Sequence, residues 1–490
     1  MTTRFVTTPA AVPNRMAGRR GLADALTALV LVGAIVGSWL AYGRTDLTLD
    51  EGYTSAETRL PFTSLLKVLW SRELNGSLHT LLMWSFDRPG QSLLRLSSTV
   101  FMVAALVLLH RFARAHFGSW AAFVSLVVAA MNPVIQQDMV IGRTYALSML
   151  LVMISALLFD VAVRDGGTMR FIRWGSLSGL MLYAHFLTGL VVAGQVLWLV
   201  VFHRAQLREW AAGLAASLVL SVSIWFFFLS GGASHGQLLP VPPRSVGGLV
   251  AGVLDVIAGY GRAVTVTKAV VVLLIVGVVA VGLTSGTRRV ASLGVFTFAV
   301  PVLTLAVGAQ FSSSLFSERY LVFAVPGLAI AVGAGIRGCL DRSRRLALVS
   351  TTLLTAFSVA FCLMATVSMV DTPWTQRHPW SAAMRAVGTG QAVITAVPVE
   401  GYLARLYAQE YGAAFVQEFP ATATAFLAQS SYENRSCASL TWPSGPVWIV
   451  STMSPDFDAA YRNLARCGNY RPVAVRVYES MRAAELRPAG

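Results

Sequence analysis

Two adjacent carboxylates, Asp50 and Glu51, lie in the stretch Leu49–Tyr53, directly after the first long apolar segment of about residues 22–42. Acidic side chains at the edge of a membrane are costly to keep there, so they are candidates for function. A carboxylate in that place could act as a general base and take a proton from an attacking hydroxyl group. The alternative is that both acids mark a solvated helix end, and the residue types alone leave both interpretations open.

The composition places most of the chain in lipid. Of the 490 residues, 55% are hydrophobic and only 12% are charged, against roughly 25% charged residues in soluble proteins. The formal net charge of +15 could indicate nucleic acid, but the arginines fall in short clusters between apolar segments. That is the pattern of the positive-inside rule. We therefore expect a multi-pass protein of the cell membrane, in contact with membrane lipid and with no nucleic-acid partner.

The apolar segments predict a mainly α-helical protein with about 11 transmembrane helices. Arginines precede the first segment, which is too long for a signal peptide and has no clear cleavage site, so we expect a signal anchor with a cytoplasmic N-terminus. Arginine clusters fall in every predicted inner loop. The later spans are expected at about 93–112, 121–135, 145–161, two within 174–202, 211–229, 266–283, 293–307, 320–336 and 346–369.

The stretch 174–202 carries basic residues at both ends. A single crossing would put one of these clusters outside, whereas two short crossings keep both inside. We therefore predict a break near Tyr183-Ala184-His185. The exposed backbone of such a turn would need shelter from neighbouring protein.

The polar parts form a first outer loop, about 43–91, and a C-terminal domain. In the loop we expect short interfacial helices around Leu60–Trp70, with Trp70 and Trp84 as anchors. Residues 1–370 are predicted to form the membrane domain, and 371–490 a small extracytoplasmic α/β domain with no cofactor. Its expected elements are parallel strands Ala392–Thr395 and Val447–Ser451, helices Ala382–Val387, Gly401–Tyr411 and Asp456–Leu464, and a last strand Arg471–Tyr478.

The four cysteines have two expected roles. Cys339 and Cys362 lie in or beside predicted spans and are expected to pack there. Cys437 and Cys467 lie in the outer domain, where a disulfide between them is plausible and spacing alone does not establish it. The sequence has no CxxC motif or His-Cys cluster that would indicate zinc or haem.

Several short motifs occur in a fixed topological order. They are Asp50-Glu51 after the first span, Arg95-Leu96-Ser97 entering the second, Asn132-Pro133 closing the third, Arg143-Thr144-Tyr145-Ala146-Leu147 opening the fourth, and Glu318-Arg319-Tyr320 opening the tenth. Over about residues 22–339 this resembles the bacterial members of the dolichyl-phosphate-mannose–protein mannosyltransferase-like family, within the GT-C glycosyltransferases. The family's His-Pro-Pro-Leu-like motif has only Asn75–His79 as its counterpart, in which His79 alone corresponds.

The resemblance implies transfer of a sugar from a polyprenyl-phosphate donor to a glycan, lipid or protein acceptor on the outer membrane face. Asp50 would be the general base. Inversion is expected because no second nucleophile is evident. Glu51 would orient the acceptor, or help to hold a divalent cation if one is used.

The resemblance also implies cations that stabilise the leaving lipid phosphate. Arg319 is the first candidate and Arg143 the second, because a guanidinium can donate pairs of hydrogen bonds to phosphate. The alternative for each arginine is snorkelling to lipid headgroups. Asp138 would bind the acceptor or pair with Arg143. Further candidates are Arg95, expected to pair with a first-loop carboxylate, and Glu318, Tyr145 and His79.

Two other classes remain as alternatives. A secondary transporter also has many spans and buried charge, but it often has paired broken helices, and only the segment at His185 is a candidate here. The other alternative is a non-catalytic cell-envelope assembly protein that keeps the GT-C-like fold.

Overall fold

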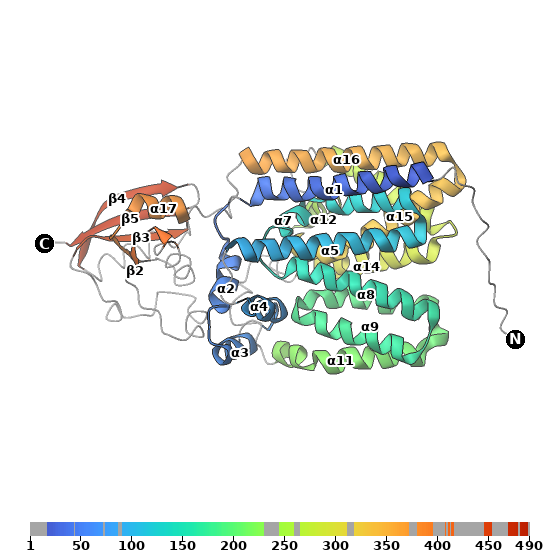
Figure 1. The fold of residues 1–490 in the computed structure, drawn as a ribbon, viewed down its shortest axis with the longest axis horizontal. Coiled ribbons are helices and arrows are strands. Elements are labelled where there is room, and N and C mark those ends of the chain that lie inside the picture. The colour runs from blue at the N-terminus through green and yellow to red at the C-terminus, as the bar shows by residue number, and fades with distance from the viewer. Residues whose placement is uncertain are drawn as a thin grey trace.

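The computed structural model is a bundle of long helices with a small sheet at one end (Figure 1). It describes residues 17–43, 45–71, 74–86, 91–229, 245–258, 265–310, 318–371, 380–394, 407, 410–411, 413–415, 445–452, 469–478 and 481–488. The protein is thus mainly α-helical with a small C-terminal α/β region, as the sequence predicts.

The helices of the bundle match the predicted apolar segments. In the described residues, seven helices are long and apolar enough to cross a membrane, and three more are apolar but shorter. The predicted number of eleven spans is not established by this measure. The bundle helices are α1 (Ala17–Tyr42), α5 (Gln91–Phe117), α6 (Ser119–Ala130), α8 (Tyr145–Asp165), α9 (Thr168–Leu180), α10 (Gly189–Phe202), α11 (Leu207–Leu229), α13 (Thr265–Leu283), α14 (Arg288–Gly308), α15 (Val325–Arg342) and α16 (Arg344–Asp371).

Helix α15 forms the centre of the bundle. In the apolar 18-residue window of the candidate span that contains it, Arg319–Arg342, 94% of the residues are buried inside the protein. Its neighbours come very close, because a Cβ added to Gly327 would lie 2.8 Å from the carbonyl oxygen of Gly294 on α14. Small residues at such contacts let membrane helices pack backbone to backbone.

The predicted break in the stretch 174–202 is present. Between α9 and α10 lie two short 3-10 turns, η2 (Met181–Tyr183) and η3 (Phe186–Thr188). The freed backbone groups are bonded by neighbouring segments, as membrane depth requires. The bonds are Gly76 N–H to Tyr183 O (3.1 Å), Thr144 Oγ1 to Ala184 O (2.5 Å) and Phe186 N–H to Asn75 Oδ1 (3.0 Å).

The described part of the predicted first outer loop contains three short helices, α2 (Leu49–Glu57), α3 (Phe62–Ser71) and α4 (Ser77–Trp84). They lie at the end of the bundle that faces the sheet (Figure 1). Trp70 is largely exposed, and the indole N–H of Trp84 donates to the Leu60 carbonyl at 3.0 Å. Helix α3 confirms a short helix in the expected stretch Leu60–Trp70.

The C-terminal sheet has the strand order β2-β1-β3-β5-β4. Strand β1 (Ala392–Ile394) pairs in parallel with β2 (Ala414–Phe415) and with β3 (Val447–Thr452), as expected for the two buried strands. Helix α17 (Trp380–Val387) matches the first predicted helix of this domain.

One prediction about this sheet is wrong. Strand β4 (Tyr470–Tyr478) is not the last strand, because β5 (Met481–Pro488) follows it and inserts between β3 and β4 in antiparallel pairing. The sequence of β5 alternates apolar and charged residues only weakly, so the period-two pattern typical of strands did not predict it.

Several expectations fall outside the described residues. These are the disulfide between Cys437 and Cys467, the helix Asp456–Leu464 and most of the helix Gly401–Tyr411. The two described cysteines, Cys339 and Cys362, are free and buried, as packing residues would be.

The close approach of α9 and α11 gives a first prediction. A valine at Gly175 should destabilise the bundle, because a Cβ there collides with the carbonyl oxygen of Gly213. Overpacking of this kind costs about 1–3 kcal/mol. Gly277→Val is the matched control, since a Cβ at Gly277 meets nothing within 4 Å. Thermal unfolding in detergent should shift only for Gly175→Val, and equal shifts would contradict this packing.

Candidate active site at the end of the bundle beside the sheet

Helix α2 begins with a capping box. The Thr48 hydroxyl accepts the Glu51 N–H at 3.2 Å, and the Glu51 carboxylate accepts the Thr48 N–H at 2.8 Å. This reciprocal pair satisfies two backbone donors that a helix start otherwise leaves open. It fixes the first turn of α2, on which Asp50 lies.

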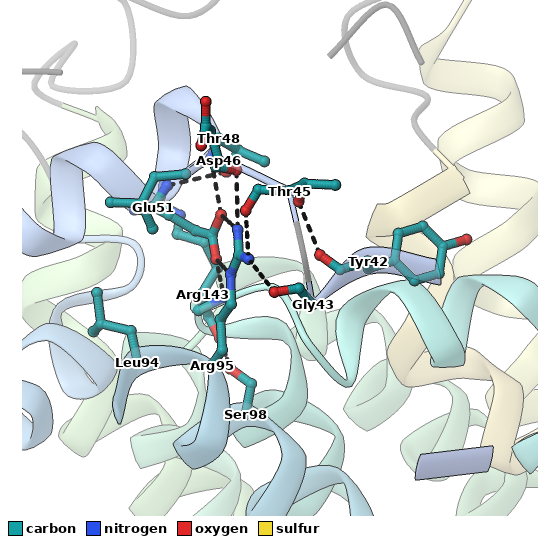
Figure 2. A network of polar contacts seen from close by, with 12 residues as sticks. Tyr42, Gly43, Thr45, Asp46, Thr48, Glu51, Leu94, Arg95, Ser98 and Arg143 are labelled. Carbon is teal, nitrogen blue, oxygen red and sulfur yellow. Dashed lines mark hydrogen bonds and ion pairs between the residues drawn. The ribbon is translucent and has the colours of Figure 1, made fainter. Parts of the chain in front are cut away.

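Arg95 of α5 binds the segment between α1 and α2 and the first turn of α2 (Figure 2). Its guanidinium donates to both oxygens of the Glu51 carboxylate, at 2.9 and 3.0 Å. It also donates to the carbonyls of Gly43 (3.2 Å), Thr45 (2.8 Å) and Asp46 (3.0 Å). All five N–H donors of the arginine are therefore used. The side chains of Arg95 and Glu51 are 3% and 0% exposed.

Glu51 also binds the loop that follows α7 (Pro133–Asp138). Its Oε1 accepts the Gly142 N–H at 2.9 Å. A Cβ on Gly142 would lie 2.7 Å from the Leu94 Cβ, so only glycine fits this approach. Glu51 thus ties α2, α5 and this loop together. Arg95 pairs with a first-loop carboxylate, as expected.

Asp50 points away from this buried pair and meets Arg319. The distance from Asp50 Oδ2 to Arg319 Nη1 is 3.5 Å, across 269 residues of sequence. The side chains of Arg319 and Asp50 are 19% and 35% exposed. The predicted base and the first predicted phosphate ligand therefore lie together and remain accessible.

The other predicted residues gather around this pair. Tyr145 interacts electrostatically with Arg319, Asp50 and Arg143. The Arg143 guanidinium donates to the Thr54 hydroxyl of α2 at 3.0 Å. Of the predicted residues, only Glu318 has no described side-chain position, although its backbone starts the 3-10 helix η7 (Glu318–Ala324).

Asp138 lies at the end of α7 and is fully buried. Neither of its carboxylate oxygens has a hydrogen-bond partner within the described part of the chain. Burial raises the pKa of Asp138 from 3.8 to about 8, against the opposing effect of the nearby Arg319 charge. Asp138 is therefore mainly protonated and neutral at pH 7.

His79 of α4 is also buried and neutral. Burial, together with the charge of Arg143, lowers the pKa of His79 from 6.5 to about 3. The same two causes lower the pKa of His185 to about 3. Neither imidazole can serve as a cation for phosphate near neutral pH.

His185 is a site neighbour that the sequence did not assign. Its ring centroid lies 5.5 Å from that of Tyr145, 5.7 Å from Tyr320 and 5.6 Å from Phe323. The break between α9 and α10 brings it there, and that break was the one sequence signal that could have marked it. Tyr320 gave no separate signal because it stands beside Arg319, and Thr54 lies three residues after Glu51 with no signal of its own.

The sequence left open a divalent cation at this site, held in part by Glu51. The described residues include no group of three or more His, Cys, Asp and Glu side chains that could hold a metal ion. Glu51, the expected ligand, has its two oxygens bonded to Arg95, Gly142 and Thr48. The donor set described here therefore does not fit a divalent cation.

Comparison with known proteins gives one family match and several structural matches. The family profile described as dolichyl-phosphate-mannose-protein mannosyltransferase matches residues 80–227, less than half of the chain. A search of curated proteins finds no match. Together with the structural matches described next, the profile supports a membrane protein of the GT-C glycosyltransferase superfamily, as the sequence motifs predict.

Two similar solved structures are both ArnT from Cupriavidus metallidurans. The structure bound to undecaprenyl phosphate has a TM-score of 0.60 and 12% sequence identity, and the match covers 95% of this chain and 98% of ArnT. The apo structure has a TM-score of 0.56 and 13% identity, covering 96% and 98%. At this identity the likeness establishes the fold.

The buried ion pair gives a second prediction. Arg95→Met should lower the free energy of unfolding by about 3–5 kcal/mol, because it leaves the Glu51 charge buried without its partner. Arg114→Met, also on α5, is the matched control. It removes an ion pair with Asp24 whose side chains are 42% and 48% exposed, and such pairs contribute only about 0–1 kcal/mol. Unfolding in detergent would measure both, and similar losses would contradict the role given to Arg95.

Asp138 gives a third prediction, on pH. The folded protein keeps the Asp138 proton up to about pH 8, whereas an unperturbed aspartate loses it near 3.8. The folded state binds more protons between these values, so this group lowers stability as the pH rises through them. Asp138→Asn should therefore stabilise the protein increasingly from about pH 4 to about pH 8.

Thermal unfolding at pH 5 and pH 8 would check this. Asp341→Asn is the control, because Asp341 forms a half-exposed pair with Arg337. A stabilisation by Asp138→Asn that is the same at both pH values would show that Asp138 is not buried as a neutral acid.

Proposed function

We propose that this protein transfers a sugar from a polyprenyl-phosphate donor to an acceptor on the outer face of the cytoplasmic membrane. The observation that carries the proposal is the contact of Asp50 with Arg319 at 3.5 Å, at the accessible end of a GT-C bundle. A base and a phosphate-binding cation at one point are what the transfer needs.

In the proposed reaction, Asp50 accepts the proton of an acceptor hydroxyl group. The hydroxyl oxygen forms a bond to the anomeric carbon of the sugar, while the bond from that carbon to the phosphate oxygen breaks. The lipid phosphate leaves with the bonding electron pair, and Arg319 stabilises its charge. A single displacement of this kind inverts the anomeric configuration.

The remaining residues divide into two groups. We propose that Arg143 is a second phosphate ligand and that Tyr145, His79 and Asp138 line the substrate site. Arg95 and Glu51 support Asp50 from within the protein, since both are buried and bonded to one another. For Glu51 this positioning role replaces direct contact with the acceptor, and for Glu318 substrate contact stays a prediction.

The likeness to ArnT supports the proposed class of donor. ArnT, which shares this fold, binds undecaprenyl phosphate in one of its crystal structures. We therefore propose a polyprenyl-phospho-monosaccharide donor, such as the mannose or arabinose form. The acceptor is a glycan, a lipid or a protein of the cell envelope.

The side of the membrane is supported by a contact between distant segments. Residues 46 and 47, directly after α1, are hydrogen-bonded to Ser381 and Tyr407 of the C-terminal region. Both parts therefore lie on one side, which requires an even number of crossings between them. Ten crossings follow α1 when α9 and α10 are counted as the two predicted crossings of the stretch 174–202, and ten is an even number. An extracytoplasmic C-terminal domain follows if the N-terminus is cytoplasmic, as its arginines indicate.

Asp50→Asn tests the function directly. Purified protein would be supplied with radiolabelled polyprenyl-phosphate sugars and a membrane extract as acceptor. Transfer from one donor should fall by about 10²–10⁴-fold in the variant, as expected for loss of a general base. Asp24→Asn, an exposed acid at the far end of α1, should keep full transfer.

Two outcomes would change the proposal. Transfer that survives in Asp50→Asn would move the role of base to another carboxylate. Absence of transfer from every donor, with the wild-type protein folded, would return the choice to a transporter or an assembly protein.

A further inference from the structure

The connection between α1 and α2 is held on two sides. From the bundle, Arg95 donates to the carbonyls of Thr45 and Asp46. From the C-terminal region, the Ser381 N–H donates to Asp46 Oδ2 at 2.8 Å. The Leu47 N–H donates to the Tyr407 hydroxyl oxygen, also at 2.8 Å. Residues 45–47 are therefore bonded both to the helix bundle and to the C-terminal region.

Leu47 belongs to the core of the C-terminal domain rather than to the bundle. Its side chain is 2% exposed and packs in a cluster with residues far away in sequence. A buried apolar side chain resists withdrawal, because withdrawal would return its surface to water. The cluster includes Trp380, Met384, Tyr407, Trp448 and Val450.

Asp46 also acts as a helix cap. Ser381 is the second residue of α17, and its N–H is one of the donors that a helix start leaves without an internal partner. A carboxylate at this end is further favoured by the helix dipole. The connection and α17 thus stabilise one another.

Asp50 follows Leu47 after only two residues, and the second of them starts α2. Thr48 is itself fixed by the capping box. A rigid link of this length transmits a shift of Leu47 to Asp50, because little free chain separates the two residues.

We infer that the C-terminal domain sets the position of Asp50 opposite Arg319 through residues 46–47. Leu47 and Tyr407 are positioning residues for the transfer reaction, and Tyr407 lies beyond the part of the chain that the family resemblance covers. This inference rests on the proposed function for its effect on the reaction. Its effect on the structure of α2 can be measured without any substrate.

Tyr407→Phe is the main test variant. It keeps the ring in the cluster and removes the oxygen that accepts the Leu47 N–H. Loss of one hydrogen bond should make the amides of residues 47–52 exchange with deuterium about 2- to 10-fold faster. The kcat of sugar transfer should fall while the KM for the donor stays the same, because Arg319 is untouched.

Tyr411→Phe is the matched control. Tyr411 lies one turn later, packs against the same cluster, and has Arg385 over its ring at 5.7 Å. Its substitution should change neither the exchange of residues 47–52 nor kcat. A second pair of variants uses Asp46. Asp46→Ala should reproduce the effect of Tyr407→Phe, and Asp46→Asn, which keeps an oxygen for Ser381, should largely restore kcat.

The outcomes separate the two proposals. Equal exchange of residues 47–52 in Tyr407→Phe and Tyr411→Phe would overturn the inference, as would faster exchange with an unchanged kcat. Faster exchange only in Tyr407→Phe and Asp46→Ala would support the link. If wild-type protein showed that link and yet transferred no sugar, the proposed function would fail and the link would stand.

Discussion

The end of the bundle beside the C-terminal sheet depends on one buried guanidinium. Arg95 has no water to replace a lost partner, so each of its five N–H groups must find an acceptor in the protein. It finds them in one carboxylate and in three carbonyls of the chain that leaves α1. The cost of removing this charge from water makes any other arrangement of that chain unfavourable. Arg95 therefore fixes the bundle side of the segment that leads into α2.

Arg319 stands between two acids in different environments. Asp50 is partly exposed and within 3.5 Å of it, whereas Asp138 is fully buried. Solvent access leaves the first within reach of a ligand. Burial keeps the second neutral around pH 7, so the site does not collect two negative charges beside one arginine.

The sequence predicted the features that depend on local pattern. Apolar length and the arginine clusters located the spans, and the basic flanks of 174–202 located the break at His185. Asp50 and Arg319 were selected because each lies near the end of a predicted span. Their mutual contact is a long-range property that no local pattern encodes. The different roles of Asp50 and Glu51 also depend on tertiary structure, since neighbouring residues on α2 point to different surroundings. Strand β5 and the insertion of Leu47 into the other domain were missed for the same reason.

The central place of α15 bears on how the protein is made. This helix is almost fully enclosed, yet it begins only at residue 325, after most of its neighbours have been synthesised. Until it enters, α6, α13 and α14 must surround a space filled by lipid or by other chains. Final closure of the bundle is thus a late event of biosynthesis. A chain that ends before α15 would leave the close-packed glycines of α14 and α13 without their partner helix.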